Sequence, residues 1–299
     1  MENKRNYLER NLAEALSLYE NDASREAIDM YNTILQQSQN ELTNDDLQLV
    51  YFYLGGAYFD LDQYAEALDY FDKSLGICAN DAEIWKSKGD VFLTIEDYQT
   101  ALECYDKSLE IDAYDAEAWN SKGDALYLLD NEGEALQCYN RSVEIDPNNA
   151  EAWNNKGEVL YLMKEYKDAL ECYKKSAELD PKEKSYWLNK GVIENELEEY
   201  EDAVDSFSRS VELDPDFVEG WNGKGLALSL LGDGDEALEC FDKALKIDPD
   251  SSESWDNKGL ALEIMDKLPE ALKCYQAALR LDPGNESYEE NIKELRKKM

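Results

Sequence analysis

The stretch 116–149, AEAWNSKGDALYLLDNEGEALQCYNRSVEIDPNN, decides the fold because its pattern recurs along the chain every 34 residues. The recurrence is clearest for tryptophan and for the glycine that follows four residues later. These pairs are Trp85 and Gly89, Trp119 and Gly123, Trp153 and Gly157, Trp187 and Gly191, Trp221 and Gly225, and Trp255 and Gly259. Tyr51 and Gly55 take the same two places one period earlier. Such self-similarity indicates a repeat architecture in which each unit packs on its neighbours.

Further columns become visible when position 1 of each unit is set three residues before its tryptophan. Alanine then holds position 20, an aromatic residue position 24, and Ser or Ala position 27, as in Ala135, Tyr139 and Ser142. Positions 4, 8 and 11 share one face of a helix, and positions 20, 24 and 27 share one face of a second helix. Each unit is therefore predicted to be a hairpin of two helices, A and B, that approach closely at the small Gly and Ala residues.

This order of aromatic, Gly, Ala, aromatic and Ala, closed by proline at position 32, resembles the tetratricopeptide repeat (TPR) family. The resemblance covers seven contiguous repeats over residues 48–285. It implies an all-α fold, a right-handed α-solenoid with an inner groove. Ala27 and Tyr31 predict a degenerate repeat within residues 1–47, followed by an inserted loop around 37–45. Residues 286–299 are predicted to form a C-terminal capping helix, with Tyr288, Ile292 and Leu295 on one face.

The charge of the chain limits its partners, because 68 acidic residues against 30 basic ones give a formal net charge of −38. A field of this sign repels nucleic acid and anionic membranes. It either attracts basic partners or maintains solubility in salt, and composition leaves both open. No signal peptide or membrane-spanning run is present in the sequence, so a cytoplasmic location is expected.

Residues suited to catalysis or to metal binding are scarce. The chain has no histidine, no Cys-x-x-Cys pair and no glycine-rich phosphate loop. We therefore expect no enzyme, no catalytic residues, no metal site and no cofactor. The segment Gly232–Asp235 is interpreted as a turn between helices A and B. A column of cysteines at 34-residue spacing is interpreted as buried thiols in a reducing compartment: Cys104, Cys138, Cys172, Cys240 and Cys274.

The family resemblance implies that ligands contact positions 2, 5, 6 and 9 of helix A. Position 2 carries Glu83, Glu117 and Glu151, and position 9 carries Asp90, Asp124, Glu158, Val192, Leu226 and Leu260. Amides hold positions 5 and 6 at Asn120, Asn154, Asn155, Asn189, Asn222 and Asn257. The candidate groove is thus acidic in its middle and apolar toward its C-terminal end. The alternatives are that the polar residues form ordinary solvated helix faces and that the apolar ones pack on a neighbouring repeat.

Two branches of the family differ in how they hold a peptide. The branch that grips acidic C-termini uses Lys and Arg at positions 2 and 6, where this chain has mostly glutamate at position 2 and Ser, Asn or Gly at position 6, so that basic clamp is missing. The other branch binds a peptide backbone through a column of Asn at position 6, which Asn155, Asn189 and Asn257 match in part. We expect a protein or peptide partner that is basic or amphipathic. The alternative is a structural module that self-associates through its terminal repeats.

Lysine fills position 7, where the family usually has leucine, in the six units that carry tryptophan. These residues are Lys88, Lys122, Lys156, Lys190, Lys224 and Lys258. Each is expected to pack its stem beside the tryptophan column and to direct its amine toward nearby acids. The aspartates at position 31, such as Asp112 and Asp214, are the predicted acceptors.

Overall fold

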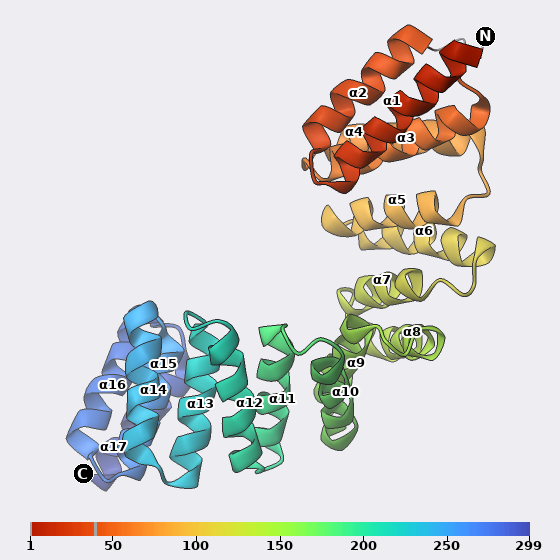
Figure 1. Ribbon diagram of the computed structural model, residues 1–299. Coiled ribbons are helices and arrows are strands. Elements are labelled where there is room, and N and C mark those ends of the chain that lie inside the picture. The colour runs from red at the N-terminus through yellow and green to blue at the C-terminus, as the bar shows by residue number, and fades with distance from the viewer. Residues whose placement is uncertain (1, 39–40) are drawn as a thin grey trace. The chain divides into compact units, whose positions relative to one another are not determined.

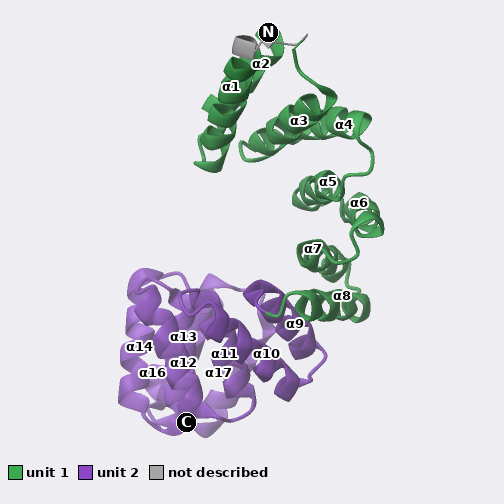
Figure 2. Ribbon diagram, turned by 45° about the vertical axis from the view of Figure 1, so that its right-hand side comes forward, with its two compact units in different colours: residues 1–147 green, residues 148–299 purple. Residues whose placement is uncertain are grey.

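The computed structural model describes residues 2–38 and 41–299, which form seventeen α-helices and no strand (Figure 1). The chain divides into two compact units, residues 1–147 and residues 148–299 (Figure 2). Each unit is a stack of helical hairpins in which successive helices pack on one another. The fold is an all-α solenoid, as the sequence predicts.

Unit 1 contains four hairpins. Its helices are α1 (Glu2–Glu20), α2 (Ser24–Ser38), α3 (Asn44–Phe59), α4 (Tyr64–Ile77), α5 (Ala82–Thr94), α6 (Tyr98–Ile111), α7 (Ala116–Tyr127) and α8 (Glu132–Ile145). Within the unit, each A helix contacts its own B helix, the B helix before it and the preceding A helix.

Unit 2 contains four more hairpins and a final single helix. Its helices are α9 (Ala150–Leu162), α10 (Tyr166–Leu179), α11 (Lys184–Glu196), α12 (Tyr200–Leu213), α13 (Val218–Leu231), α14 (Gly234–Ile247), α15 (Ser252–Ile264), α16 (Leu268–Leu281) and α17 (Glu286–Lys298). The final helix packs on α16 and buries Tyr288, Ile292 and Leu295, the face predicted for the capping helix.

Helix A of most repeats begins at a polar residue that caps the first turn. The Asp115 carboxylate accepts a hydrogen bond of 3.0 Å from the backbone N–H of Ala118, and Asn149 does the same for Ala152 at 2.9 Å. Such a side chain satisfies one of the N–H groups that lack a partner inside the helix. These capping residues recur at the same repeat position and therefore help to set where each helix A begins.

A residue with left-handed backbone conformation follows helix A, at position 15 of every repeat. Six of the seven full repeats place a residue other than glycine there, such as Asp130 with φ of 55°, and only the repeat of α13 has a glycine there, Gly232, at φ of 95°. The next backbone N–H closes the turn, as from Asn131 to the Leu126 carbonyl at 2.9 Å. This geometry terminates helix A and turns the chain into helix B. Gly232 and Asp233 thus form the predicted turn between helices A and B, and Gly234 and Asp235 already belong to the first turn of α14.

The glycine that recurs at position 8 of each full repeat is explained by the aromatic residue at position 24. An added Cβ at Gly123 would lie 2.5 Å from the Tyr139 ring, closer than real carbon atoms approach. The ring therefore packs directly on the backbone of helix A. Ala135 and Tyr139 are both buried at this contact, which forms the centre of the α7–α8 hairpin.

The tryptophan and serine columns tie neighbouring segments together through backbone carbonyls. The indole Nε1 of Trp119 donates to the carbonyl of Ala113 at 3.1 Å, in the loop that enters the repeat. The hydroxyl of Ser108 donates to the carbonyl of Ala82 at 2.8 Å, at the start of the partner helix A. Both columns thus hold the hairpin and the loop before it in a fixed geometry.

The first hairpin, α1–α2, follows the same plan without the tryptophan. Leu8, Ala15, Ala27 and Tyr31 are buried, and Asp22 takes the left-handed turn position with φ of 58°. Of the expected inserted loop, residues 37–38 end α2, residues 44–45 begin α3, and residues 39–40 lie outside the described part of the chain.

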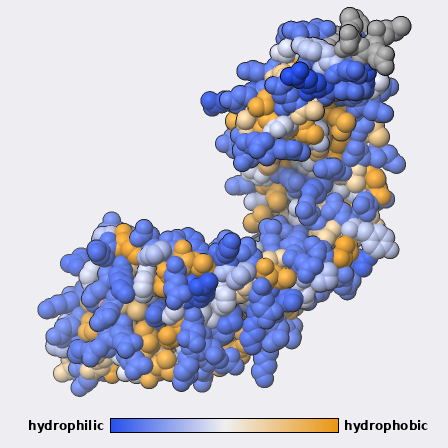
Figure 3. Space-filling model, in the orientation of Figure 1, coloured by the Kyte–Doolittle hydropathy of each residue, from blue (hydrophilic) through white to orange (hydrophobic). Residues whose placement is uncertain are grey.

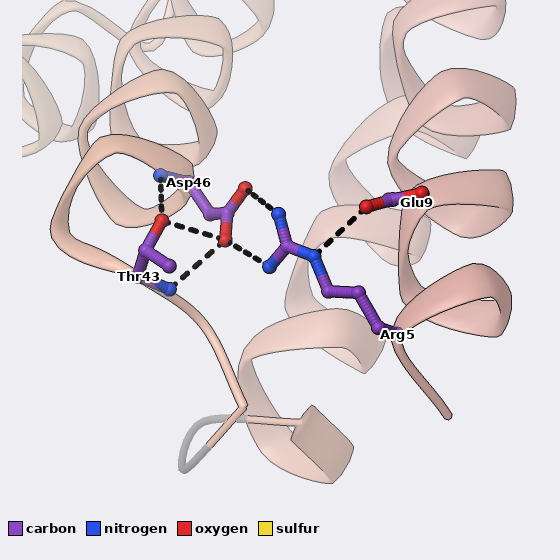
Figure 4. A network of polar contacts seen from close by, with 4 residues as sticks. All are labelled: Arg5, Glu9, Thr43 and Asp46. Atoms are coloured by element: carbon purple, nitrogen blue, oxygen red, sulfur yellow. Dashed lines mark hydrogen bonds and ion pairs between the residues drawn. The ribbon is translucent and has the colours of Figure 1, made fainter. Parts of the chain in front are cut away.

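A polar network joins α1 to the start of α3 (Figure 4). The Arg5 guanidinium donates to both carboxylate oxygens of Asp46, at 2.6 and 3.2 Å, and to Glu9 at 2.9 Å. Asp46 also accepts from the backbone N–H of Thr43, whose hydroxyl caps α3 in return. Hydrogen bonding to Arg5 is the main reason that the pKa of Asp46 is lowered. This network fixes the N-terminal hairpin against the first full repeat.

All six cysteines are free, and the five of the 34-residue column are buried, as predicted. Burial raises the pKa of Cys104, Cys138 and Cys172 to about 11. These thiols are therefore protonated at neutral pH and act as small apolar residues of the core.

Candidate partner-binding face

The position 2 glutamates lie on the surface of helix A. Glu83, Glu117 and Glu151 are exposed, and so are the later members of the column, Glu219 and Glu253. Glu117 of α7 accepts from the Lys86 amine of α5 at 2.5 Å. This surface column carries much of the negative charge that the sequence assigns to the groove.

The position 9 aspartates are turned toward the interior of their hairpins. Asp90 accepts a hydrogen bond of 2.8 Å from the Tyr105 hydroxyl, and Asp124 accepts one of 2.7 Å from the Tyr139 hydroxyl. Both aspartates are half-buried. Burial, above all, raises the pKa of Asp90 despite the hydrogen bond from Tyr105, and burial together with the Asp90 charge raises the pKa of Tyr105. These two acids are part of the packing between helix A and helix B.

The change from acid to apolar residue at position 9 follows the identity of the aromatic at position 24. Where the aromatic is Phe207 or Phe241, which needs no acceptor, position 9 holds Val192 or Leu226. Tyr275 is paired with Leu260, and its hydroxyl instead donates to Glu263 at 2.8 Å, one turn further along α15. Glu158 and Tyr173 hold the same two positions in α9–α10, where Glu158 is half-buried. The apolar end of the predicted groove therefore reflects internal packing in part.

The three apolar candidates differ in how far they reach solvent. Val192 is 36% exposed, whereas Leu226 and Leu260 are half-buried. Val192 thus offers the largest apolar contact of the three.

The amides form contacts between successive helices A within unit 2. Asn189 of α11 donates to Asn154 of α9 at 2.8 Å, and Asn154 lies 3.4 Å from the side-chain oxygen of Asn155. At the end of the unit, Asn291 of α17 donates to Asp256 of α15 at 2.9 Å. Amides and acids from neighbouring repeats are thus brought side by side along one face of the stack, and Asn257 is half-buried on α15.

Two asparagines at position 5 are buried. Asn120 is 5% exposed and lies 3.5 Å from Asp124, on the same helix. Asn222 is also 5% exposed, and its side-chain oxygen is buried with no hydrogen-bond partner. A buried carbonyl oxygen that accepts no hydrogen bond costs free energy, so the Asn222 side-chain oxygen is an unsatisfied acceptor on this face.

Carboxylates gather beside Asn222. Although the Glu253 side chain reaches solvent, the protein around its carboxylate removes part of its hydration. This desolvation, followed by the charge of Glu219, raises the pKa of Glu253, and a hydrogen bond from the Asn222 side chain opposes that shift. Burial likewise raises the pKa of Asp256. Two glutamates from successive repeats, Glu219 and Glu253, therefore repel each other on the face of α13 and α15.

The lysine column lies beside the tryptophans as predicted, with each of the six amines 5.1–5.9 Å from the ring centroid of the tryptophan three residues earlier, but its acceptors differ from the prediction. The amines of Lys122 and Lys258 pair with Asp106 at 2.6 Å and Asp242 at 2.5 Å, and Lys88 pairs with Asp72 in the same way. These acceptors lie at position 25 of the preceding helix B, not in the aspartate column at position 31 as predicted. The position 31 aspartates instead accept backbone N–H groups in the loops, as Asp112 does from Tyr114 at 2.9 Å. These three lysines thus reach helix B of the preceding repeat, whereas Lys190 binds Glu194 on its own helix.

Repeat α11–α12 contains a buried polar cluster that was not predicted from the sequence. The Glu194 carboxylate is 1% exposed, binds the Lys190 amine at 2.7 Å and accepts from the Ser206 hydroxyl at 2.6 Å. Leu228 and Cys240 hold these two positions in the next repeat. In repeat α11–α12, Glu replaces Leu and Ser replaces Cys at these two positions, and this joint replacement could have indicated the polar cluster from the sequence.

Residues 2–38 and 41–299 contain no group of three or more Cys, Asp and Glu residues arranged to hold a metal ion. No helix within this part of the chain has the length and apolar character needed to cross a bilayer.

The family comparisons match most of the repeat array. Models described as "Tetratricopeptide repeat" match residues 48–113, 150–183, 185–217, 218–251 and 252–285, and one described as "TPR repeat" matches residues 133–164. No curated protein sequence matches the chain significantly.

Solved structures share the fold at low sequence identity. YrrB, described as "a TPR protein with an unusual peptide-binding site", is 23% identical, with a TM-score of 0.55 over 64% of this chain and 99% of its own. PilF of Pseudomonas aeruginosa is 23% identical, with a TM-score of 0.64 over 71% of this chain and 96% of its own. A chain of the APC/C hetero-tetramer Cut9–Hcn1 is 14% identical, with a TM-score of 0.63 over 97% of this chain and 58% of its own. With its helices, its repeat columns and these family matches, the chain belongs to the tetratricopeptide repeat family.

Proposed function

We propose that this chain is a protein-interaction scaffold that binds a basic segment of a partner protein on the helix A faces of its repeats. The observation that carries the proposal is the cluster of Glu219, Asn222 and Glu253 on α13 and α15. It combines two carboxylates that repel each other with a buried amide oxygen that lacks a donor. The peptide-binding site named for YrrB supports the class of ligand.

A lysine or arginine of the partner fits this cluster chemically. A cation placed between Glu219 and Glu253 relieves their repulsion, and its N–H groups are the kind of donor that amide and carboxylate oxygens accept. The net charge of −38 adds long-range attraction for basic segments and speeds their association. The free thiols of the core suit a cytoplasmic protein.

Selection of binders from a random peptide display library tests the proposal. We expect enriched sequences to be rich in Lys and Arg, and their binding to weaken as salt rises from 50 to 300 mM. The variant Glu219→Gln/Glu253→Gln should weaken binding about tenfold, on the order of 1.4 kcal/mol.

The control variant, Glu236→Gln/Glu239→Gln, removes the same charge from two exposed residues of helix B in α14. It should change affinity by less than about twofold if only long-range charge is affected. Enrichment of acidic peptides, or equal losses in the two variants, would overturn the proposal.

Self-association through the C-terminal end is a second candidate. A pocket of about 440 Å³ between α16 and α17 is lined by three cations, one acid and three uncharged residues: Arg280, Lys293, Arg296, Glu289, Gln276, Leu279 and Ile292. Glu289 pairs with Lys293 at 3.2 Å, so the lining keeps a net positive charge. A basic pocket on an acidic chain can attract the acidic surface of a second copy. Light scattering should show a dimer that Arg280→Glu/Lys293→Glu abolishes and Lys167→Glu/Lys182→Glu preserves. A monomer at all concentrations would exclude this candidate.

A further inference from the structure

A pocket of about 490 Å³, called the Trp255 pocket below, lies between α15 and α16 in unit 2. Figure 3 shows apolar patches among hydrophilic side chains over the C-terminal helices. The pocket combines apolar residues that are buried or half-buried with three cations, namely Trp255, Leu262, Ala277, Lys258, Lys273 and Arg280. Its α15 residues hold helix A positions 4, 7 and 11. The pocket therefore lies outside the candidate face formed by positions 2, 5, 6 and 9.

The Trp255 pocket lies where the other full repeats place a long side chain. Position 26 is Ala277 in this repeat, whereas the other six carry a cation there: Lys73, Lys107, Arg141, Lys175, Arg209 and Lys243. In the repeat of α5 and α6, the Lys107 amine lies 4.2 Å from the centroid of the Trp85 ring. Ala277 is too short to cover Trp255 in this way, so the tryptophan is open to a group from outside the chain.

The charges on both sides of position 26 are reversed in this repeat. Position 22 is Asp or Glu in five of the other six repeats, and position 29 is Glu in four of them. In three repeats the cation at position 26 pairs with the glutamate at position 29, at 3.0–3.7 Å. Here positions 22 and 29 are Lys273 and Arg280. An acid, a cation and an acid are thus replaced by a cation, Ala277 and a second cation.

Lys273 and Arg280 are not neutralised from within the molecule. Both are exposed, and neither has an ion pair in the part of the chain that the structure describes. Lys258, by contrast, pairs with Asp242 at 2.5 Å. The lining contains one acid, Glu270, which lies one turn before Lys273 and at the opposite end of α16 from Arg280. The pocket is therefore positively charged from its middle toward Arg280.

We infer that the Trp255 pocket binds an aromatic side chain with a neighbouring carboxylate, supplied by an acidic segment of a partner protein. The ring takes the place of the missing position 26 side chain on Trp255, because aromatic rings attract each other in offset or edge-to-face contact. The carboxylate lies over Ala277 and pairs with Lys273 and Arg280. These two cations are seven residues apart on one face of α16, about 10 Å along the helix axis, so both can reach an anion between them.

The size and openness of the pocket agree with this ligand. A benzene-sized group occupies a cavity of about 150 Å³, so the pocket has room for an aromatic side chain and the residue beside it. A protein segment is favoured over a free metabolite, because small-molecule sites enclose most of their ligand whereas Lys273 and Arg280 are exposed. The inference goes beyond the proposed function, since this ligand has the opposite charge and contacts different repeat positions.

Nuclear magnetic resonance of the full chain tests the pocket through the indole N–H signals of its six tryptophans. The probe is the peptide acetyl-Gly-Phe-Glu-Gly-amide at millimolar concentration. We expect the Trp255 signal, assigned with Trp255→Phe, to shift while the Trp221 signal stays in place. Replacing Glu of the probe by Gln should weaken binding at least about threefold, because the ion pairs are lost. Replacing its Phe by Ala should abolish the shift.

Variants of α16 separate this pocket from the one between α16 and α17. Lys273→Gln/Arg280→Gln changes two exposed residues and should abolish the shift. The matched control, Lys293→Gln/Arg296→Gln, removes two cations that line only the other pocket and should leave the shift unchanged. Ala277→Glu places a carboxylate between the two cations within the helix. It should abolish probe binding without lowering the midpoint of thermal unfolding.

The preceding repeat offers a control for the charge reversal. The Lys243 amine lies 4.2 Å from the centroid of the Trp221 ring, so Lys243→Ala uncovers that tryptophan as Ala277 does in the next repeat. The flanking residues there are Glu239 at position 22 and Lys246 at position 29, not two cations. We therefore expect the probe to leave the Trp221 signal of this variant unshifted.

The pocket assignment is overturned if the Trp255 signal does not move or if its shift survives Lys273→Gln/Arg280→Gln. An equal shift with inorganic phosphate at the same concentration would also overturn it, by showing general anion binding. The expected affinity is on the order of 1 mM, too weak for enrichment from a display library. The shift should persist in Glu219→Gln/Glu253→Gln, so failure of this inference and failure of the proposed function are distinguishable.

Discussion

Hairpins α7–α8 and α1–α2 both bury a tyrosine at the same repeat position but treat its hydroxyl differently. Tyr139 donates to Asp124 at 2.7 Å. The hairpin of Tyr31 has Leu16 at the position equivalent to Asp124, and the Tyr31 hydroxyl has no hydrogen-bond partner. The difference shows that an acid on the helix A face can be required by the core. A charge on that face is therefore a binding residue only where no internal donor uses it.

The largest effect is expected from the glycine that admits the tyrosine ring. Gly123→Ala places a Cβ against Tyr139 and should destabilise the chain by about 1–3 kcal/mol in urea unfolding. The matched control is Gly133→Ala in α8, where nothing lies near the added Cβ, and it should be neutral or stabilising. Equal costs at Gly123 and Gly133 would refute the explanation that the tyrosine ring requires glycine at position 8. Hairpin α1–α2, by comparison, has Ala15 at that position.

Removal of the hydroxyl should have opposite signs in the two hairpins. Tyr139→Phe removes a hydrogen bond to a carboxylate and should cost about 1.5–3 kcal/mol. Tyr31→Phe removes a buried hydroxyl that has no partner and should leave stability unchanged or raise it by about 1 kcal/mol. Unfolding in urea measures both, and a loss at Tyr31 as large as that at Tyr139 would show that the Tyr31 hydroxyl has a partner in solution.

An acid introduced at the N-terminal hairpin should convert it to the other type. Leu16→Asp gives Tyr31 an acceptor, and the gain of a hydrogen bond offsets part of the lost apolar contact. We expect a net cost below about 1 kcal/mol, and a larger cost for the same change in the variant that carries Tyr31→Phe. Equal costs in the two backgrounds would mean that the new carboxylate does not reach the hydroxyl.

The smallest effect is a contrast in pH dependence within unit 1. The pKa of Asp90 is raised, so its native form gains a proton before the unfolded form and stability rises as pH falls toward about 4. The pKa of Asp46 is lowered, so its contribution is present above about pH 4 and is lost as pH falls below that value. Stability differences from Asp90→Asn and Asp46→Asn, measured from pH 3 to 7, should show these opposite trends. Parallel trends would contradict the burial of Asp90.

The fold was predictable from sequence because its determinants recur at fixed spacing. The tryptophan, glycine and alanine columns predict the hairpins, and the apolar face of residues 288–295 predicts the final helix. Partners within the polar columns were not predictable from spacing alone. Lys88, Lys122 and Lys258 pair with acids on the preceding helix B, whereas Lys190 pairs with Glu194 on its own helix, and spacing does not distinguish these partners.

The candidate site was only partly visible in the sequence for a similar reason. The exposed glutamates at position 2 could be placed from periodicity, but the inward pairing of Asp90 requires reading positions 9 and 24 together. That pairing rule is present in the sequence, since tyrosine accompanies an acid in three repeats and phenylalanine accompanies Val192 or Leu226 in two.

A double-mutant cycle on Asp90 and Tyr105 tests most directly whether helix A acids serve the tyrosines of helix B. Unfolding free energies are measured for Asp90→Leu, Tyr105→Phe and the double variant, which recreates the natural pair Leu226 and Phe241. We predict that the double variant is more stable than the sum of the single losses implies, with a coupling of about 1.5–3 kcal/mol. A coupling near zero would contradict the pairing of Asp90 with Tyr105, and Asp90 would then be a surface charge available to a ligand.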